Sequence, residues 1–135
     1  MTHRPGVLGV VAVGGMIGSS ARYGIARALP VHPGDVPWAT LVTNLAGSFL
    51  LGIVLAVVAH RMPGHRYARP FLAGGVLGGF TTMSTFQVET ALLLGDDRGA
   101  TALAYVLVSV AGGTLLTLAG LALGRRAAPA RTEAR

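Results

Sequence analysis

Among the polar side chains that lie inside otherwise apolar stretches of the chain, seven could carry chemistry. They are Arg22, Asn44, Ser84, Thr85, Glu89, Tyr105 and Ser109. A polar group in lipid is unfavourable unless it faces protein or water. Most of these side chains are N–H or O–H donors, and the ring edge of Phe86 is electropositive. Donors gathered without a ring of carboxylates can replace the water around a small anion, so the set indicates an anion pathway.

Each of these residues also has a simpler interpretation when it is considered alone. A single asparagine or serine in a membrane span commonly hydrogen-bonds a neighbouring helix, and Phe86 alone would serve packing. Arg22, near the end of its span, either extends to the membrane surface or attracts anions. Only the combination of donors favours the pathway.

The residue types that enzymes and metal sites commonly need are absent or dispersed. The chain has no cysteine, which excludes thiolate ligands and cysteine nucleophiles. The four histidines lie near span ends or in connections and show no ligand spacing with a carboxylate. Glu89 is the only acid inside a span, so no acid–base pair is evident. The sequence therefore predicts a protein that is not an enzyme.

Length and composition indicate a small membrane protein with one domain. Of 135 residues, 52% are hydrophobic and only 12% are charged, against about 25% in soluble domains. A bilayer core of about 30 Å needs roughly 20 apolar residues per helix. Four windows meet this length: 7–29, 38–59, 71–94 and 100–123. We therefore expect an all-α integral membrane protein with four transmembrane helices in residues 1–124, followed by a polar cytoplasmic tail at 125–135.

Glycine pairs at four-residue spacing recur along the predicted helices. The pairs are Gly14 and Gly18, Gly74 and Gly78, Gly75 and Gly79, and Gly120 and Gly124. Such pairs allow helix backbones to approach closely in lipid. Because four helices of this size can hardly enclose an aqueous path alone, we also expect oligomerisation.

The third window differs from the others because its glycines crowd into 74–79 and hydroxyl residues follow within 81–85. Low helix propensity and side chains that hydrogen-bond the backbone both favour a break of this helix at mid-membrane. Irregular backbone at that depth must be buried in protein or line a cavity, and its exposed carbonyls can hold a cation.

Taken together, these stretches resemble a known family, the small bacterial fluoride channels called Fluc or CrcB. The similar stretches are 14–23, 43–49, 75–86, and Tyr105, Ser109 and Gly113 in the last window. The resemblance covers residues 6–124, in order and with matching spacing. The ordered set is highly specific to that family.

The resemblance implies an antiparallel dimer of four-helix subunits that exports fluoride passively through two pores, with a structural sodium ion at the dimer interface. By motif position, the backbone carbonyls of Gly78 and Thr81 would coordinate the sodium ion, and Arg22 would lie near the vestibule. The fluoride pathway would be lined by Asn44, Met83, Ser84, Thr85, Phe86, Tyr105 and Ser109. Met83 stands where the family usually has a phenylalanine, and a methionine lacks the aromatic ring edge.

Two other classes of membrane protein also fit four small helices. A small multidrug-type exporter of cationic compounds is a four-helix dimer, but it would need a carboxylate near the middle of the first window, which has none. A non-conducting scaffold would leave the hydroxyl residues behind the third-window glycines without a role. Fluoride efflux from liposomes, compared with chloride efflux, separates the three.

The arginines predict the orientation of the chain in the membrane. Eight lie on one side: Arg4, Arg61, Arg66, Arg69, Arg125, Arg126, Arg131 and Arg135. The opposite side has Arg27 and Arg98. This positive-inside bias places both termini in the cytoplasm. A self-paired antiparallel dimer needs copies inserted both ways, so the bias favours a heterodimer with a paralogous subunit over a homodimer.

Overall fold

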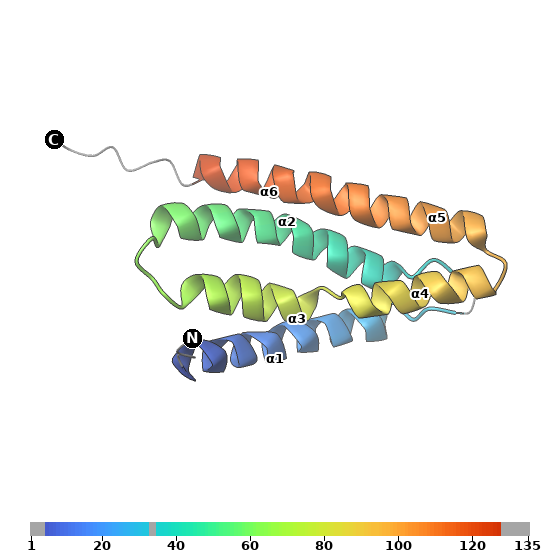
Figure 1. Cartoon of the computed structure of the whole chain (residues 1–135), viewed down its shortest axis with the longest axis horizontal. Helices are drawn as coiled ribbons and strands as arrows, with labels where there is room; N and C mark the ends of the chain where they lie inside the picture. The colour runs from blue at the N-terminus through green and yellow to red at the C-terminus, as the bar shows by residue number, and fades with distance from the viewer. Residues whose placement is uncertain (1–4, 33–34, 128–135) are drawn as a thin grey trace.

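The computed structural model describes residues 5–32 and 35–127, and its regular structure in these ranges is helical (Figure 1). The first two spans are single helices, α1 (Pro5–Ala28) and α2 (Trp38–Arg61). The third span has three parts, η1 (Pro70–Leu77), α3 (Gly78–Phe80) and α4 (Met83–Gly95). The fourth is continuous through α5 (Gly99–Leu107), η2 (Val108–Gly112) and α6 (Gly113–Ala127). The segments η1 and η2 are π-helical turns inside their spans.

The helices run over the four apolar windows of the sequence, with ends that differ by a few residues. Two of them, Trp38–Arg61 and Gly99–Ala127, are long and apolar enough to cross a membrane by length and composition alone. The first helix is as long as the second, but it contains glycines, two serines and Arg22, and the third span is interrupted. The tail expected from residue 125 begins inside α6, and residues 128–135 lie outside the described ranges.

The four spans pack as two groups, and the two halves of the third span belong to different groups (Figure 1). One pair is α2 with α6, and the other is α1 with η1 and α3. Beyond the interruption, α4 no longer follows α1 and instead packs against α5. The break in the third span therefore passes the chain from one pair to the other.

Glycines make the closest contacts within both pairs. A Cβ atom at Gly18 would overlap the carbonyl oxygen of Val76, and one at Gly120 would overlap the carbonyl oxygen of Phe49. Backbones this close tolerate no side chain between them, which is the expected use of small residues in membrane helices. Three predicted pairs lie in such contacts: Gly14 and Gly18, Gly75 and Gly79, and Gly120 and Gly124.

The fourth predicted glycine pair does not pack within the chain. Gly74 and Gly78 are both exposed, and a Cβ atom at either would lie no closer than 3.7 Å to another group. Their spacing alone does not distinguish a contact with a neighbouring helix from an open surface. The prediction of close packing is therefore wrong for this pair within one subunit.

Many large apolar side chains lie on the outside of the bundle, whereas the buried set combines small residues with a few large ones such as Leu41, Leu93 and Tyr105. Exposed residues include Leu92, Leu103 and Leu115, whereas the buried set includes Ala39, Ala56, Ala102 and Thr43. An exposed apolar surface of this extent marks contact with lipid or with another protein chain. The arrangement agrees with a membrane protein whose helices associate through small residues.

Candidate ion pathway at the broken third helix

The third span leaves the helical conformation at Thr81 and Thr82, whose torsion angles of φ −83°, ψ 157° and φ −147°, ψ 121° are extended. Asn44 on α2 binds this segment with both ends of its amide. Nδ2 donates to the carbonyl oxygen of Thr82 at 3.0 Å, and the N–H of Thr82 donates to Oδ1 at 2.8 Å. These bonds satisfy backbone groups that water cannot reach in a membrane. The predicted break of the third helix is confirmed.

The break releases two backbone carbonyls from the bonds of a continuous helix. A regular helix would pair the Gly78 carbonyl with the N–H of Thr82, and the Thr81 carbonyl with the N–H of Thr85. Here the Thr82 N–H binds Asn44 instead. The Thr85 N–H binds Thr82 Oγ1 at 3.2 Å. Both carbonyls have therefore lost their helical donors, and such unwound carbonyls can coordinate a cation.

Thr82 also caps the N-terminus of α4, and it gathers the neighbouring hydroxyls around itself. Its Oγ1 accepts the Thr85 N–H, donates to Thr85 Oγ1 at 2.9 Å, and lies 3.4 Å from Ser84 Oγ. A threonine in this position satisfies an N–H that has no partner in the helix. Ser84 and Thr85, predicted as pathway residues, are thus placed in the cap of α4.

Arg22 reaches the break from α1. Its Nε donates to the carbonyl oxygen of Gly79 at 3.2 Å, near the end of α3 where carbonyls lack helical donors. The side chain is half-buried, so it turns toward the protein rather than extending to the membrane surface. The arrangement places a guanidinium charge beside the broken helix.

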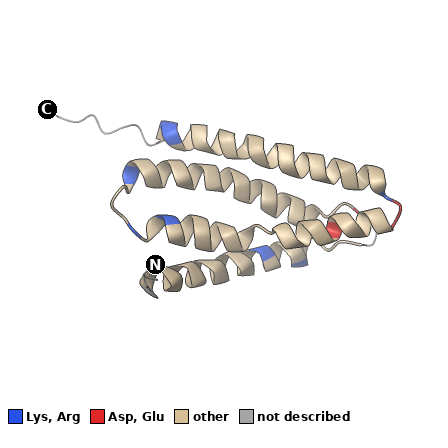
Figure 2. Cartoon of the chain, viewed as in Figure 1, with Lys and Arg blue, Asp and Glu red and all other residues tan. Residues whose placement is uncertain are grey.

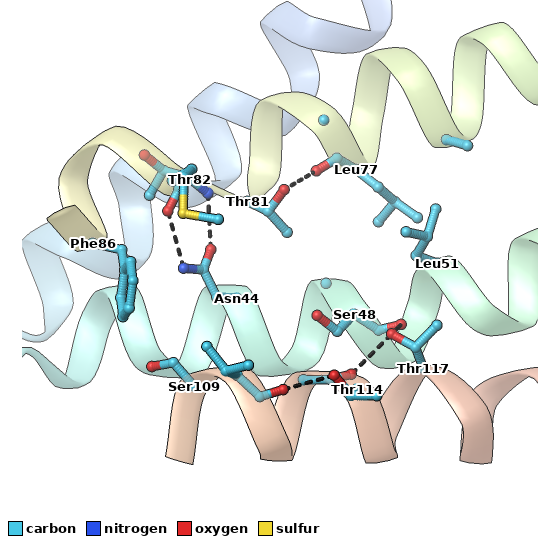
Figure 3. Close-up of a pocket in the computed structure, with 16 residues that line it drawn as sticks. Asn44, Ser48, Leu51, Leu77, Thr81, Thr82, Phe86, Ser109, Thr114 and Thr117 are labelled. Atoms are coloured by element: carbon cyan, nitrogen blue, oxygen red, sulfur yellow. Dashed lines mark hydrogen bonds between the residues drawn. The ribbon is translucent and has the colours of Figure 1, made fainter. Parts of the chain in front are cut away.

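A pocket of about 470 Å³ lies next to the break, between α2, the third span and the fourth span (Figure 3). It brings together six of the predicted site residues: Asn44, Gly78, Thr81, Met83, Phe86 and Ser109. Further hydroxyls that line it are those of Ser48, Thr82, Thr114 and Thr117. Met83 is 68% exposed, so this wall of the pocket faces the outside of the single chain.

Ser109 places a buried hydroxyl beside this pocket. Its Oγ is almost completely covered, and no group in the described part of the chain hydrogen-bonds it. A buried polar atom without a partner costs about 1–3 kcal/mol. The Ser109 hydroxyl is therefore a donor that lacks a partner within the described residues.

Tyr105 is engaged in a separate cluster beside the pocket. Its hydroxyl donates to Glu89 Oε2 at 2.8 Å, and Thr40 Oγ1 donates to Glu89 Oε1 at the same distance. The Tyr105 ring packs on Phe86, with ring centroids 5.1 Å apart. The one carboxylate inside a span is thus held by two hydroxyls, and Tyr105 positions the aromatic wall of the pocket.

Three residues near the pocket, Thr40, Thr82 and Ser48, were not predicted as site residues. Their spacing in the sequence could have indicated some of them. Thr40, Asn44 and Ser48 are four residues apart, so they share one face of α2. Tyr105, Ser109, Gly113 and Thr117 repeat this spacing on the fourth span. The two polar stripes meet where Thr117 Oγ1 donates to the Ser48 carbonyl at 3.2 Å.

Comparison with known proteins gives the family of this chain. The family model described as CrcB-like protein, Camphor Resistance (CrcB), matches residues 9–121. The chain belongs to the CrcB family. This membership confirms the resemblance, and with it an all-α membrane protein that has four transmembrane helices.

Curated relatives of this CrcB-family chain are named as fluoride-specific ion channels. It is 44% identical to FluC 3 of Streptomyces avermitilis over 96% of its own length and 64% of that protein. It is 42% identical to FluC 2 of Nocardia farcinica, covering 92% and 86% of the two chains. The identity to FluC of Paracoccus denitrificans is 46%, over 85% and 91%. These names describe channels, and none describes an enzyme.

Proposed function

We propose that this chain is a subunit of a fluoride-selective channel that exports fluoride passively and so lowers its cytoplasmic concentration. Family membership supports the ion, because the curated relatives are named for fluoride. The observation that carries the proposal is the pocket, where Asn44, Phe86 and the unpaired Ser109 hydroxyl converge beside a broken helix. A fluoride ion holds its water strongly, so its pathway needs several donors at close quarters.

The pocket meets this need with neutral donors on fixed elements. Asn44 uses one N–H for Thr82, which leaves the second N–H of its amide for the pocket. The unpaired Ser109 hydroxyl is buried beside the pocket, and Phe86 is held by Tyr105 so that its ring forms part of the wall. The Arg22 charge beside the break favours anions over cations electrostatically.

Efflux from liposomes tests the function directly. Purified protein reconstituted in lipid vesicles should release loaded fluoride rapidly while chloride stays inside, because the donors suit a small, strongly hydrated anion. Electrodes selective for each halide measure both rates. Equal fluoride and chloride release would contradict selectivity, release of an organic cation under a proton gradient would favour the multidrug-type exporter, and no release would favour the scaffold.

We also propose that a structural sodium ion, which is not transported, binds at the break. The carbonyls of Gly78 and Thr81 fit this role, because both have lost their helical donors and both residues line the pocket. Neutral carbonyls are hard oxygen ligands. The described residues contain no cluster of histidines or acids that could hold a transition metal. Such an ion would neutralise the dipoles of these carbonyls and join them to the same groups of a second subunit.

Exchange of the cation provides the test. Replacing sodium by lithium or potassium during purification should lower both the dimeric fraction and the fluoride flux, because lithium is smaller and potassium is larger than the sodium ion for which the site is proposed. Size-exclusion chromatography with light scattering measures the dimer independently of activity. A fully dimeric and fully active protein without sodium would contradict the site.

The proposed dimer is antiparallel, and the distribution of arginines favours two different subunits over two identical ones. One end of the helices carries the connection from α2 to η1 and the C-terminus of α6. This end has Arg61, Arg66, Arg69, Arg125 and Arg126, while the other end has Arg27 and Arg98 (Figure 2). Arg4, Arg131 and Arg135, which strengthen this bias, lie outside the described residues. The bias supports cytoplasmic termini and one fixed insertion. We therefore propose a heterodimer with a paralogous subunit.

Met83 supports this proposal because it is exposed at the open wall of the pocket. A second subunit would cover that wall and could provide the aromatic edge that methionine lacks.

Labelling of the termini tests the heterodimer. When the chain is expressed alone, a membrane-impermeant thiol reagent should label a cysteine added at either terminus from the cytoplasmic face only. A cysteine in the Asp96–Asp97 turn serves as the opposite-face control. Labelling of each terminus from both faces, together with fluoride flux, would refute the heterodimer.

A further inference from the structure

A second pocket, of about 600 Å³, lies where α2 ends and the third span begins. Its lining has two chemically different halves. The apolar half consists of Leu55, Val58, Ala59, Met62, Pro63 and Pro70. The basic half consists of His65, Arg66 and Arg69. The pocket is therefore shaped for a ligand with an anionic end and an apolar end.

Acids of the described chain do not neutralise the basic half. The described acids are Asp35, Asp96 and Asp97 near the opposite end of the helices and Glu89 inside α4 (Figure 2). The ion pair found among the described residues is His32 with Asp35, which involves neither Arg66 nor Arg69. The positive charge at this pocket is available to an external anion.

Local contacts orient two of the three basic groups. His65 Nδ1 accepts the N–H of Ala68 at 3.1 Å, which leaves the proton of the ring on Nε2 to be donated elsewhere. The Arg66 guanidinium stacks over the Tyr67 ring at 4.5 Å from its centroid. Held in this way, His65 and Arg66 lose little freedom when they bind a ligand.

We propose that this pocket binds the phosphodiester head group of an anionic phospholipid, with the start of an acyl chain against the apolar half. The pocket lies at the end of α2, which is a membrane span, so it lies at the depth of lipid head groups. Arginines at that depth attract anionic lipids. A soluble anion would use only the basic half, whereas a phospholipid also covers exposed Met62 and Ala59.

Native mass spectrometry of the full chain tests the lipid site. With phosphatidylglycerol added in detergent, the wild-type protein should retain a lipid that the Arg66→Gln/Arg69→Gln double variant binds roughly 30-fold more weakly, at about five-fold per arginine. Phosphatidylcholine should not be retained in this way. The control Arg27→Gln/Arg98→Gln removes an equal charge at the opposite end and should retain phosphatidylglycerol like the wild type.

Two further measurements separate the lipid from a free anion and from a folding defect. Ala59→Trp fills the apolar half, keeps every charge, and should also weaken retention of phosphatidylglycerol. Inorganic phosphate at millimolar concentration should not displace the lipid. The proposal would be overturned if the double variant retained the lipid as well as the wild type does. It would also be overturned if phosphate displaced the lipid while Ala59→Trp retained it normally. Because fluoride efflux is measured separately, this outcome leaves the proposed channel function untouched.

Discussion

Asn44→Asp is expected to lower fluoride flux through reconstituted channels by on the order of 100-fold. The substitution removes the Nδ2 donor, so that a carboxylate oxygen faces the Thr82 carbonyl in place of an N–H. It also adds a negative charge to the pocket that we propose as the path of the anion. At about 5 Å and an effective dielectric constant of about 20, that repulsion is about 3 kcal/mol. Stopped-flow or electrode-based efflux from liposomes measures the rate.

Asn44→Ala separates the effect of charge from the loss of the two hydrogen bonds. Alanine releases Thr82 without adding a charge, so its flux should fall less than that of Asn44→Asp. Thermal unfolding in detergent should show that both variants lose similar stability. Equal flux in the two variants would mean that the charge does not face the ion, and wild-type flux in Asn44→Asp would place Asn44 off the pathway.

Gly120→Val is expected to prevent stable assembly of the bundle. The new Cβ would overlap the Phe49 carbonyl oxygen and lie 3.1 Å from the Ile53 nitrogen, both of which are backbone atoms of α2. Backbone cannot turn aside as a flexible side chain can, so the cost should reach or exceed the upper end of the usual overpacking range, about 3 kcal/mol. The yield of monodisperse protein and its unfolding temperature in detergent measure the loss.

Ala119→Val is the matched control on the same helix. Ala119 is exposed, so the same β-branched side chain there faces outward and should leave stability within about 0.5 kcal/mol of the wild type. If Gly120→Val were as stable as Ala119→Val, the close approach of α2 and α6 would not hold in the folded protein.

The positions of the four spans could be predicted because each coincides with an apolar window of about the length that a bilayer needs. The break in the third span was also predictable, since glycines and hydroxyl residues weaken a helix locally. The residue at which the helix breaks could not be predicted, because several neighbouring residues have low helix propensity and the helix can be interrupted at any of them. The choice of Thr81 and Thr82 depends on Asn44, which comes from a different helix and supplies the two bonds that replace the helical ones.

The candidate site was predictable in its residue types but not in the pairing of its hydrogen bonds. Asn44, Phe86 and Ser109 do line one pocket, whereas the hydroxyl of Tyr105 donates a hydrogen bond to Glu89. A sequence shows that a hydroxyl is within a span, yet its partner depends on how two helices are rotated about their axes. The four-residue spacing from Thr40 to Asn44 was the available clue, because it places the Glu89 partner on the pocket-facing side of α2.

The two hydrogen bonds between Asn44 and Thr82 mean that one amide both holds the break in the third span and lines the pocket. A substitution of Asn44 that alters the pocket also alters the shape of the third span, so few substitutions should be tolerated there. Met83 is the opposite case, since it lines the same pocket yet is largely exposed. Under the proposed heterodimer, differences between the two paralogous subunits should therefore accumulate at Met83 and its surroundings, where a substitution leaves the scaffold intact.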